Sequence, residues 1–406
     1  MWTTSFQLFL LHHLRVCVFL KCTLCRWDAA SEQIIPAKAT LEEILYQKTQ
    51  LVSGVGYAIG IILKLSVGKD SIAEKCQGVL FLLCLVICIL SRWYWPRKGQ
   101  LSEPCRMLNS CFKYEKVVVK EHGKPAHQPA TRDKVMVAFL RLLEMTAFLF
   151  PLLVVAIQLH NPCALPFLGS WSPYCVDGDW IPPPLLVHAL MLLADFWVWL
   201  HFVYDGSFYF VYAYMTSMVA MLDYLEHFEK LIREPRIYPR PKKVPSGPLE
   251  CRVTRALRTY RCIRLIEKIM NYSMKGQLVP AMIGIVPLIQ VFTQFVCIKL
   301  YSEIPLPGFL IFPMLLLDSA IVNLVIETMA ANVHTNSVRL LAELNFELKS
   351  LPRRSKFRKE LEACTATRIQ FGQNFVDKGT PLVIENYCIS QTVSLLLLNS
   401  TKTVGK

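Results

Sequence analysis

The sequence lacks the short motifs that mark common enzyme active sites. It contains no Walker phosphate-binding loop, no GxSxG nucleophile elbow, no HExxH zinc motif and no second CxxC to accompany Cys22 and Cys25. A structural zinc site needs four ligands, so one isolated CxxC does not predict a metal centre. We therefore expect no catalytic residues, no metal and no cofactor, and the sequence argues against an enzyme.

Lysine and arginine are scarce in every second segment between the long apolar runs. In chain order, the segments contain 5 Lys plus Arg in 1–48, 2 in 68–77, 9 in 96–135, 0 in 160–181, 13 in 224–276, 1 in 299–306, 9 in 331–379 and 2 after residue 398. Basic residues accumulate in loops that stay in the cytoplasm. The alternation predicts seven crossings with a cytoplasmic N-terminus and an extracellular C-terminus, the reverse of a G-protein-coupled receptor.

The apolar runs themselves predict an all-α, polytopic membrane protein. Of the 406 residues 53% are hydrophobic, and about 20 apolar residues cross a bilayer as one helix. We expect seven spans, at residues 51–67, 78–95, 136–159, 182–204, 277–301, 306–329 and 380–398. The formal net charge of +14 falls mainly in the predicted inside loops. It therefore predicts contact with anionic lipid and no nucleic-acid partner.

Two apolar stretches leave alternatives open. Residues 6–20 contain His12, His13 and Arg15, which favours an amphipathic helix within a cytoplasmic segment, 1–48, over an eighth crossing or a signal peptide. The fourth run continues beyond Asp205, and we expect one long helix that leaves the bilayer. A separate span at 207–222 is the alternative, and either extra crossing would invert the predicted sidedness.

The remaining organisation follows from charge and helical period. Spans one to six, with the extension of the fourth, occupy 49–330. Arginine recurs at every third position from 252 to 264, and leucines alternate with charges in 331–379. These patterns predict amphipathic helices that bury their apolar stripes against each other in a cytoplasmic anchor region. Residues 380–406 form the last helix and a short extracellular tail.

One face of the last span is partly polar. Glu385, Thr392, Leu396 and Asn399 fall on it at helical spacing. Several copies around a symmetry axis could enclose a water-filled pore, with Leu396 closing it and Glu385 favouring cations. The alternative is that this face contacts a neighbouring helix of the same subunit.

Polar and aromatic residues near the predicted outer ends of the spans suggest a cavity for a small organic molecule. The candidates for ligand binding are Gln158, His188, Trp197, Gln294, Tyr301 and Phe312. The alternative is that these residues anchor helices at the headgroup level. Cys163 and Cys175 share the uncharged loop predicted to lie outside, which makes them candidates for a disulfide.

Several stretches resemble the arthropod gustatory and odorant receptor superfamily: LPFLGSWSPYC (165–175), the long fourth helix from 194 to 225, LRTYRCIRLIEKIMNYSM (257–274) and DKGTPLVIENYCISQTVSLLLL (377–398). The family signature of Thr-Tyr, five residues and Gln-Phe is matched here only at Thr392.

The resemblance implies a chemosensory receptor of the plasma membrane that is itself a ligand-gated, non-selective cation channel. It implies a homo- or hetero-tetramer with related subunits, a small-molecule stimulus bound in the outer bundle, and a pore lined by the last helix. By position, Leu396, Asn399 and Ser400 would line the narrow part. The alternatives are a receptor coupled to an intracellular signalling protein and a secondary transporter, but we find no internal repeat between the two halves.

Overall fold

The computed structural model describes residues 2–23, 25–36, 40–68, 71–94, 103–122, 131–176, 179–233, 247–350 and 356–404. The long helices are α1 (Trp2–Phe19), α2 (Leu41–Val67), α3 (Ile72–Tyr94), α4 (Glu103–His122), α5 (Thr131–His160), α6 (Leu185–Ser207), α7 (Thr216–Arg233), α8 (Gly247–Met274), α9 (Leu278–Lys299), α10 (Ile311–Ile321), α11 (Glu327–Glu347) and α13 (Thr380–Val404).

Short elements connect the long helices. They are β1 (Cys25–Asp28), β2 (Gln33–Pro36), η1 (Leu168–Trp171), β3 (Cys175–Val176), β4 (Asp179–Trp180), η2 (Phe208–Met215), η4 (Gly308–Leu310), η5 (Val322–Ile326), η6 (Leu348–Ser350), α12 (Lys356–Glu362), β5 (Gln370–Phe371) and β6 (Asn374–Phe375). The strands pair only as three antiparallel hairpins, so the described chain is a helical protein.

Seven helical segments of the described residues are long and apolar enough to cross a membrane, which confirms the predicted fold class. The fourth is continuous from Leu185 to Arg233 through α6, η2 and α7. The first begins at Leu41, ten residues earlier than predicted, because Thr40 and Glu43 form a capping box. Residue 95, the predicted end of the second span, lies outside the described residues. The sidedness of the bundle stays a prediction.

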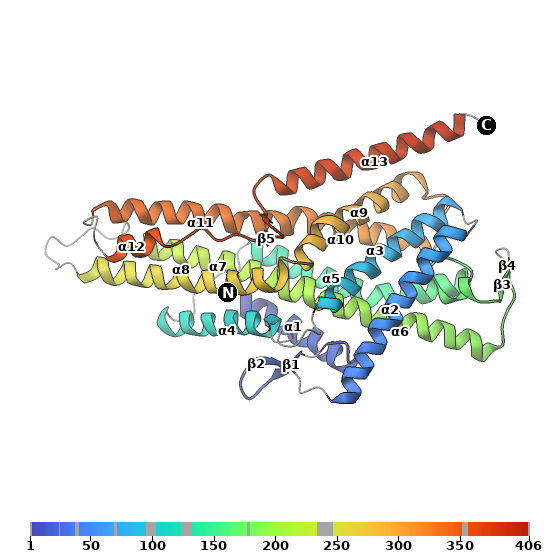
Figure 1. The fold of residues 1–406 in the computed structure, drawn as a ribbon, viewed down its shortest axis with the longest axis horizontal. Coiled ribbons are helices and arrows are strands. Elements are labelled where there is room, and N and C mark those ends of the chain that lie inside the picture. Colours follow the sequence, from blue (N-terminus) through green and yellow to red (C-terminus); the bar gives the residue numbers. More distant parts are fainter. Residues whose placement is uncertain are drawn as a thin grey trace.

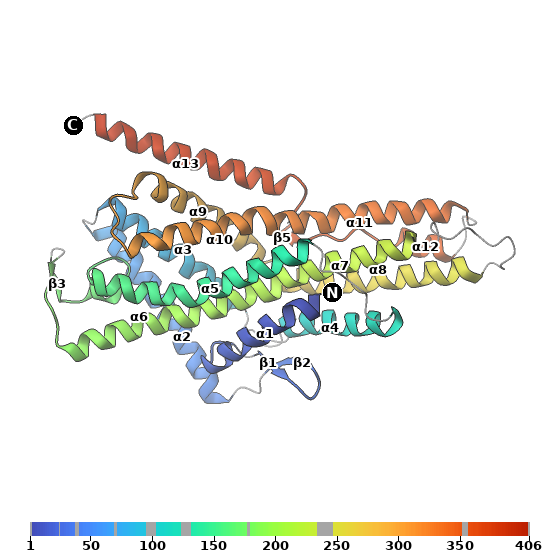
Figure 2. The same cartoon turned by 180° about the vertical axis from the view of Figure 1, so that it is seen from behind.

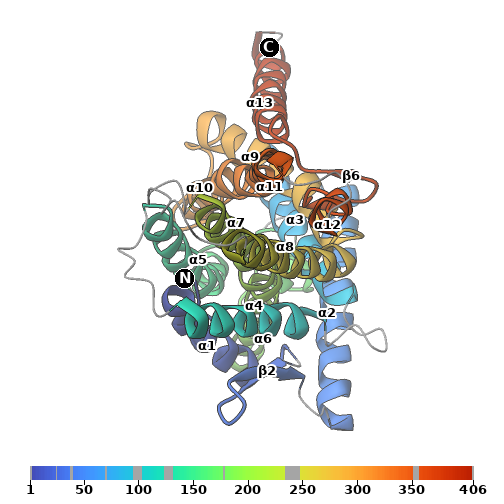
Figure 3. The ribbon, with the colours of Figure 1, turned by 90° about the vertical axis from the view of Figure 1, so that its left-hand side faces the viewer.

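The helices form two bodies along the long axis of the molecule (Figure 1). Apolar spans gather towards the end that carries β3 and β4, called here the hairpin end. At the opposite end, α4, α7, α8, α11 and α12 form a helical body, which Figure 2 shows from behind. Seen along the long axis, α13 projects from the bundle beside α9 and α11 (Figure 3).

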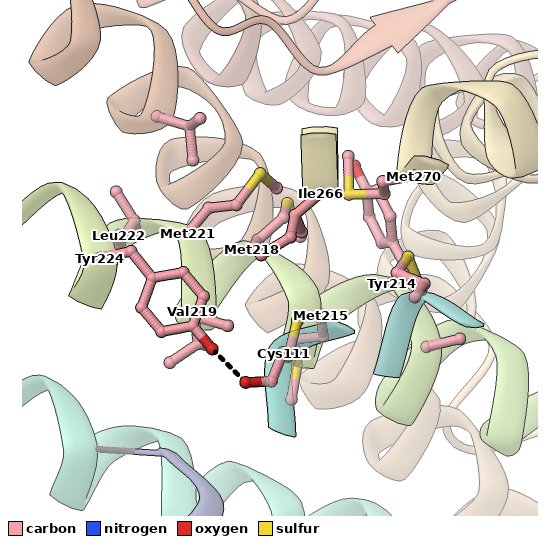
Figure 4. Close-up of a cluster of buried hydrophobic side chains, with 14 of the residues drawn as sticks. Cys111, Tyr214, Met215, Met218, Val219, Met221, Leu222, Tyr224, Ile266 and Met270 are labelled. Atoms are coloured by element: carbon pink, nitrogen blue, oxygen red, sulfur yellow. Dashed lines mark hydrogen bonds between the residues drawn. The ribbon is translucent and has the colours of Figure 1, made fainter. Parts of the chain in front are cut away.

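The helical body has its own apolar core where α7 meets α4 and α8. Met215 of η2 and Met218 and Met221 of α7 are buried there with Met270 of α8 (Figure 4). Methionine is flexible and fills irregular gaps between helices. The Tyr224 hydroxyl donates a hydrogen bond to the Cys111 carbonyl at 3.1 Å, which joins α7 to α4.

The arginines of α8 pair with acidic side chains of the helical body. Arg252 lies 3.8 Å from Glu347 of α11, and Arg261 lies 3.1 Å from Glu360 of α12. Pairing between helices explains why arginine recurs without forming a single stripe. The first helix, α1, is not among the seven spans; it packs one face against α5, α6 and α7.

Candidate functional site: a pocket at the hairpin end and the last helix

A pocket opens at the hairpin end between the start of α3, the end of α5 and the connection from α9 to α10. Its volume is about 160 Å³. The lining residues are Ser71, Ala73, Glu74, Gln77, Ile157, His160, Asn161, Ala164, Glu303, Ile304, Pro305 and Gly308. A cavity of about 150 Å³ is large enough for benzene, so this pocket can hold a small organic molecule.

A buried aromatic cluster lies one helical turn from the pocket along α3. It comprises Tyr57, Phe81, Phe150, Phe167 and Trp199. The Trp199 ring lies 5.0 Å from Phe81 and 5.4 Å from Phe150, measured between centroids. Phe81 stands one helical turn beyond the pocket residue Gln77 on the same face of α3. Pocket and aromatic cluster are therefore neighbours along one helix.

Asp195 fixes the helices around this cluster. Its carboxylate accepts hydrogen bonds from the Tyr57 hydroxyl at 2.7 Å and from the Leu168 backbone N–H at 3.1 Å. The Gln158 side chain also interacts with it. A buried carboxylate needs such partners because burial removes the water that would otherwise form hydrogen bonds with it. Asp195 thus joins α6 to α2, α5 and the η1 turn.

None of the six residues predicted to bind ligand lines this pocket, and their role in ligand binding stays a prediction. Gln158 is buried beside Asp195, and Phe312 is buried in the core. Trp197 donates to the Tyr46 hydroxyl at 3.1 Å, and the His188 ring lies 5.5 Å from Trp180. Gln294 contacts α13, whereas 63% of Tyr301 is exposed. The sequence indicates how deep each residue lies along its helix. It does not indicate which face of the helix contacts which neighbouring helix.

Cys163 and Cys175 are joined by a disulfide next to the pocket residues Asn161 and Ala164. The bond closes a loop between residues 12 apart in sequence. Replacing both cysteines by serine is expected to lower the free energy of unfolding by about 2–3 kcal/mol, because the unfolded chain gains freedom. Thermal unfolding in detergent measures this. Cys297→Ser serves as the control, and equal melting of the three proteins would contradict the prediction.

The partly polar face of α13 contacts α9 of the same chain. The Gln290 amide Nε2 donates to Glu385 at 3.1 Å, and the Thr392 hydroxyl donates to the Gln294 carbonyl at 2.8 Å. Leu396 is half-buried. Within one subunit these contacts agree with the helix-contact alternative, and a pore lined by Glu385, Thr392 and Leu396 stays a prediction.

A second face of α13 carries exposed polar side chains. Asn386, Ser390 and Ser394 are exposed at a spacing of four residues, so they share one face. The side chains of Asn399 and Ser400 lie outside the described residues. Of the residues in the last span 22% are buried, against 56% in α9. The last helix thus has most of its surface available for lipid or another subunit.

The start of α13 is fixed by Asp377. Its Oδ1 accepts hydrogen bonds from the Thr380 hydroxyl at 2.8 Å, the Thr380 N–H at 2.9 Å and the Gly379 N–H at 3.0 Å. The Thr380 hydroxyl and these backbone groups lower the pKa of Asp377 below its usual value. An ionised aspartate at a helix N-terminus stabilises the first turn.

Buried polar contacts between helices were missed at the sequence level. The Glu144 carboxylate of α5 accepts hydrogen bonds from His13 of α1 and from the Tyr212 hydroxyl. Arg92 of α3 lies 2.6 Å from Asp205 of α6. The signal was available, since opposite charges stood in two apolar runs.

Comparison with known proteins identifies the fold. No protein-family model matches the sequence, and a search of curated proteins finds no match. The insect olfactory receptor OR5 from Machilis hrabei, in complex with eugenol, superposes with a TM-score of 0.61 at 11% identity, covering 98% of this chain and 100% of that one. Another OR5 structure gives 0.55 at 11% identity, covering 95% and 97%. The chain is therefore a multi-pass membrane protein that shares the fold of an insect olfactory receptor.

Proposed function

We propose that this chain is a chemosensory receptor subunit, gustatory or odorant, that forms a ligand-gated, non-selective cation channel in the plasma membrane. The observation that supports it most is the fold shared with OR5 over 98% of the chain. The pocket offers a small organic stimulus apolar groups, such as Ile157 and Ile304, beside polar ones, such as Gln77 and Asn161.

The last helix is the proposed pore helix. It is attached to its own subunit along one face and exposes Asn386, Ser390 and Ser394. Copies arranged as a homo- or hetero-tetramer would bring these polar faces around a common axis. Asn399 and Ser400 follow towards the end of the same helix as candidates for its narrow part. A bound molecule opens the channel by binding the open state more tightly.

The test is an ion flux measured without any cytoplasmic signalling protein. The purified chain, reconstituted in liposomes, is challenged with eugenol and a panel of other small phenols. We expect a cation current evoked by at least one compound, without GTP. A response that appears only in cells and vanishes without GTP would overturn the channel. Epitope tags in unpermeabilised cells test the topology, since an accessible N-terminus would contradict it.

A further inference from the structure

Three polar side chains form a continuous hydrogen-bonded chain across three helical segments. Asn323 of η5 donates through Nδ2 to Gln290 Oε1 of α9 at 2.6 Å, and Gln290 Nε2 donates to Glu385 Oε2 of α13 at 3.1 Å. Asn323 and Gln290 are only 1% and 2% exposed. We call these residues the polar relay.

The chemistry of the relay allows one orientation. An ionised carboxylate only accepts hydrogen bonds, so the Gln290 amide must turn its NH₂ towards Glu385. Its carbonyl oxygen then faces Asn323, and Asn323 must offer its own NH₂. A change at either end therefore alters the group that the other end meets.

One end of the relay lies in η5, a segment that can convert between π-helix and α-helix. Asn323 belongs to the π-helix Val322–Ile326, which interrupts the span between α10 and α11. Such segments are rare and often mark functional sites. Conversion to an α-helix rotates a residue by about 100° relative to one end of the span. That rotation would carry Asn323 away from Gln290 and break the relay.

The other end lies in the span with the least support from its own subunit. The last span is 22% buried, and α13 contacts α9, η5 and α11. Two of its polar contacts with α9 connect to different parts of the bundle. The bond between Gln294 and Thr392 joins α9 to α13, whereas the relay extends through Gln290 to the π-helix.

We infer that the polar relay couples the winding of η5 to the position of α13 and so sets the gating equilibrium. Gln290, Asn323 and Glu385 are positioning residues, and the inference rests on the proposed channel function. When η5 and α13 are joined by the relay, a movement of one span changes the free energy of the other.

A double-mutant cycle tests the coupling. Asn323→Leu and Gln290→Met remove the hydrogen bonds at similar volume. Each is expected to shift the basal open probability, or the half-maximal concentration for the same phenol panel, in the same direction by about tenfold. The double variant is expected to shift no further than either single one.

The controls separate coupling from damage to the fold. Gln294→Met removes the hydrogen bond from Thr392, a contact between α9 and α13 outside the relay, and is expected to shift gating by less than the relay variants. Single-channel conductance and reversal potential are expected to stay unchanged throughout. If Asn323→Leu fails to reach the cell surface, Asn323→Ser replaces it, since serine removes the amide without adding bulk.

The failures are distinguishable. A surface-expressed, unmodified chain with neither basal nor evoked current would overturn the proposed channel. A working channel whose gating is unchanged in the Asn323 and Gln290 variants would overturn the relay alone. Additive shifts of the two single variants would also overturn it, because independent residues add.

Discussion

Replacing Arg92 by leucine is expected to lower the free energy of unfolding by about 3–5 kcal/mol, because it leaves Asp205 buried without its counter-charge. The two side chains are 7% and 1% exposed, and Arg92 Nε donates to Asp205 at 2.6 Å. Arg92 Nη2 also donates to Gln50 of α2 at 3.0 Å and to the Cys22 carbonyl at 3.4 Å. One guanidinium therefore joins three spans and the segment after α1.

The measurement is thermal unfolding of the purified protein in detergent, with the monodisperse fraction as a second readout. Arg233→Ala is the matched control, because Arg233 is 46% exposed and pairs with Glu343 at 3.1 Å on the surface. Exposed pairs contribute at most about 1 kcal/mol. Changing both Arg92 and Asp205 to leucine is expected to recover much of the loss. Equal stability of the Arg92 and Arg233 variants would contradict the argument.

The seven spans could be predicted because each needs only local information. A helix must satisfy its own backbone in lipid, so about 20 apolar residues are a sufficient signal. The long fourth helix was visible for the same reason. Helix α4 was missed, although it buries Met107, Leu108 and Cys111 at helical spacing. Counting basic residues treated the whole segment 96–135 as a loop and ignored this period.

The site could be predicted only in part, because it depends on which helix faces meet. Composition identified the partly polar face of α13, but not the contacts that Glu385 and Thr392 of this face make with α9. Ligand candidates were chosen by depth, yet the pocket is lined by helix ends and connections such as Asn161 and Pro305. Partner choice across helices is a tertiary property, and a single sequence does not state it.

Cysteines introduced along α13 are expected to react at different rates with a positively charged, water-soluble thiol reagent. The rate depends on the face of the helix that carries the cysteine. Ser394→Cys and Ser390→Cys lie on the exposed polar face. If that face lines the pore, modification of either should abolish most of the cation current, because a fixed positive group in a narrow channel repels cations. Thr392→Cys should be protected, since Thr392 is 5% exposed and bonded to Gln294.

Ile389→Cys is the control for a side chain that is exposed on the helix surface but is expected to face lipid. Ile389 is 58% exposed, but it lies about 100° around the helix from Ser390, where we expect lipid. Charged reagents need water, so this cysteine should react slowly and leave the current unchanged. The unmodified chain controls for native cysteines, including the buried Cys388. Rapid modification of the cysteine at 392 with protection of the one at 394 would show that the face with Glu385 and Thr392 lines the pore. The prediction from the sequence would then be right.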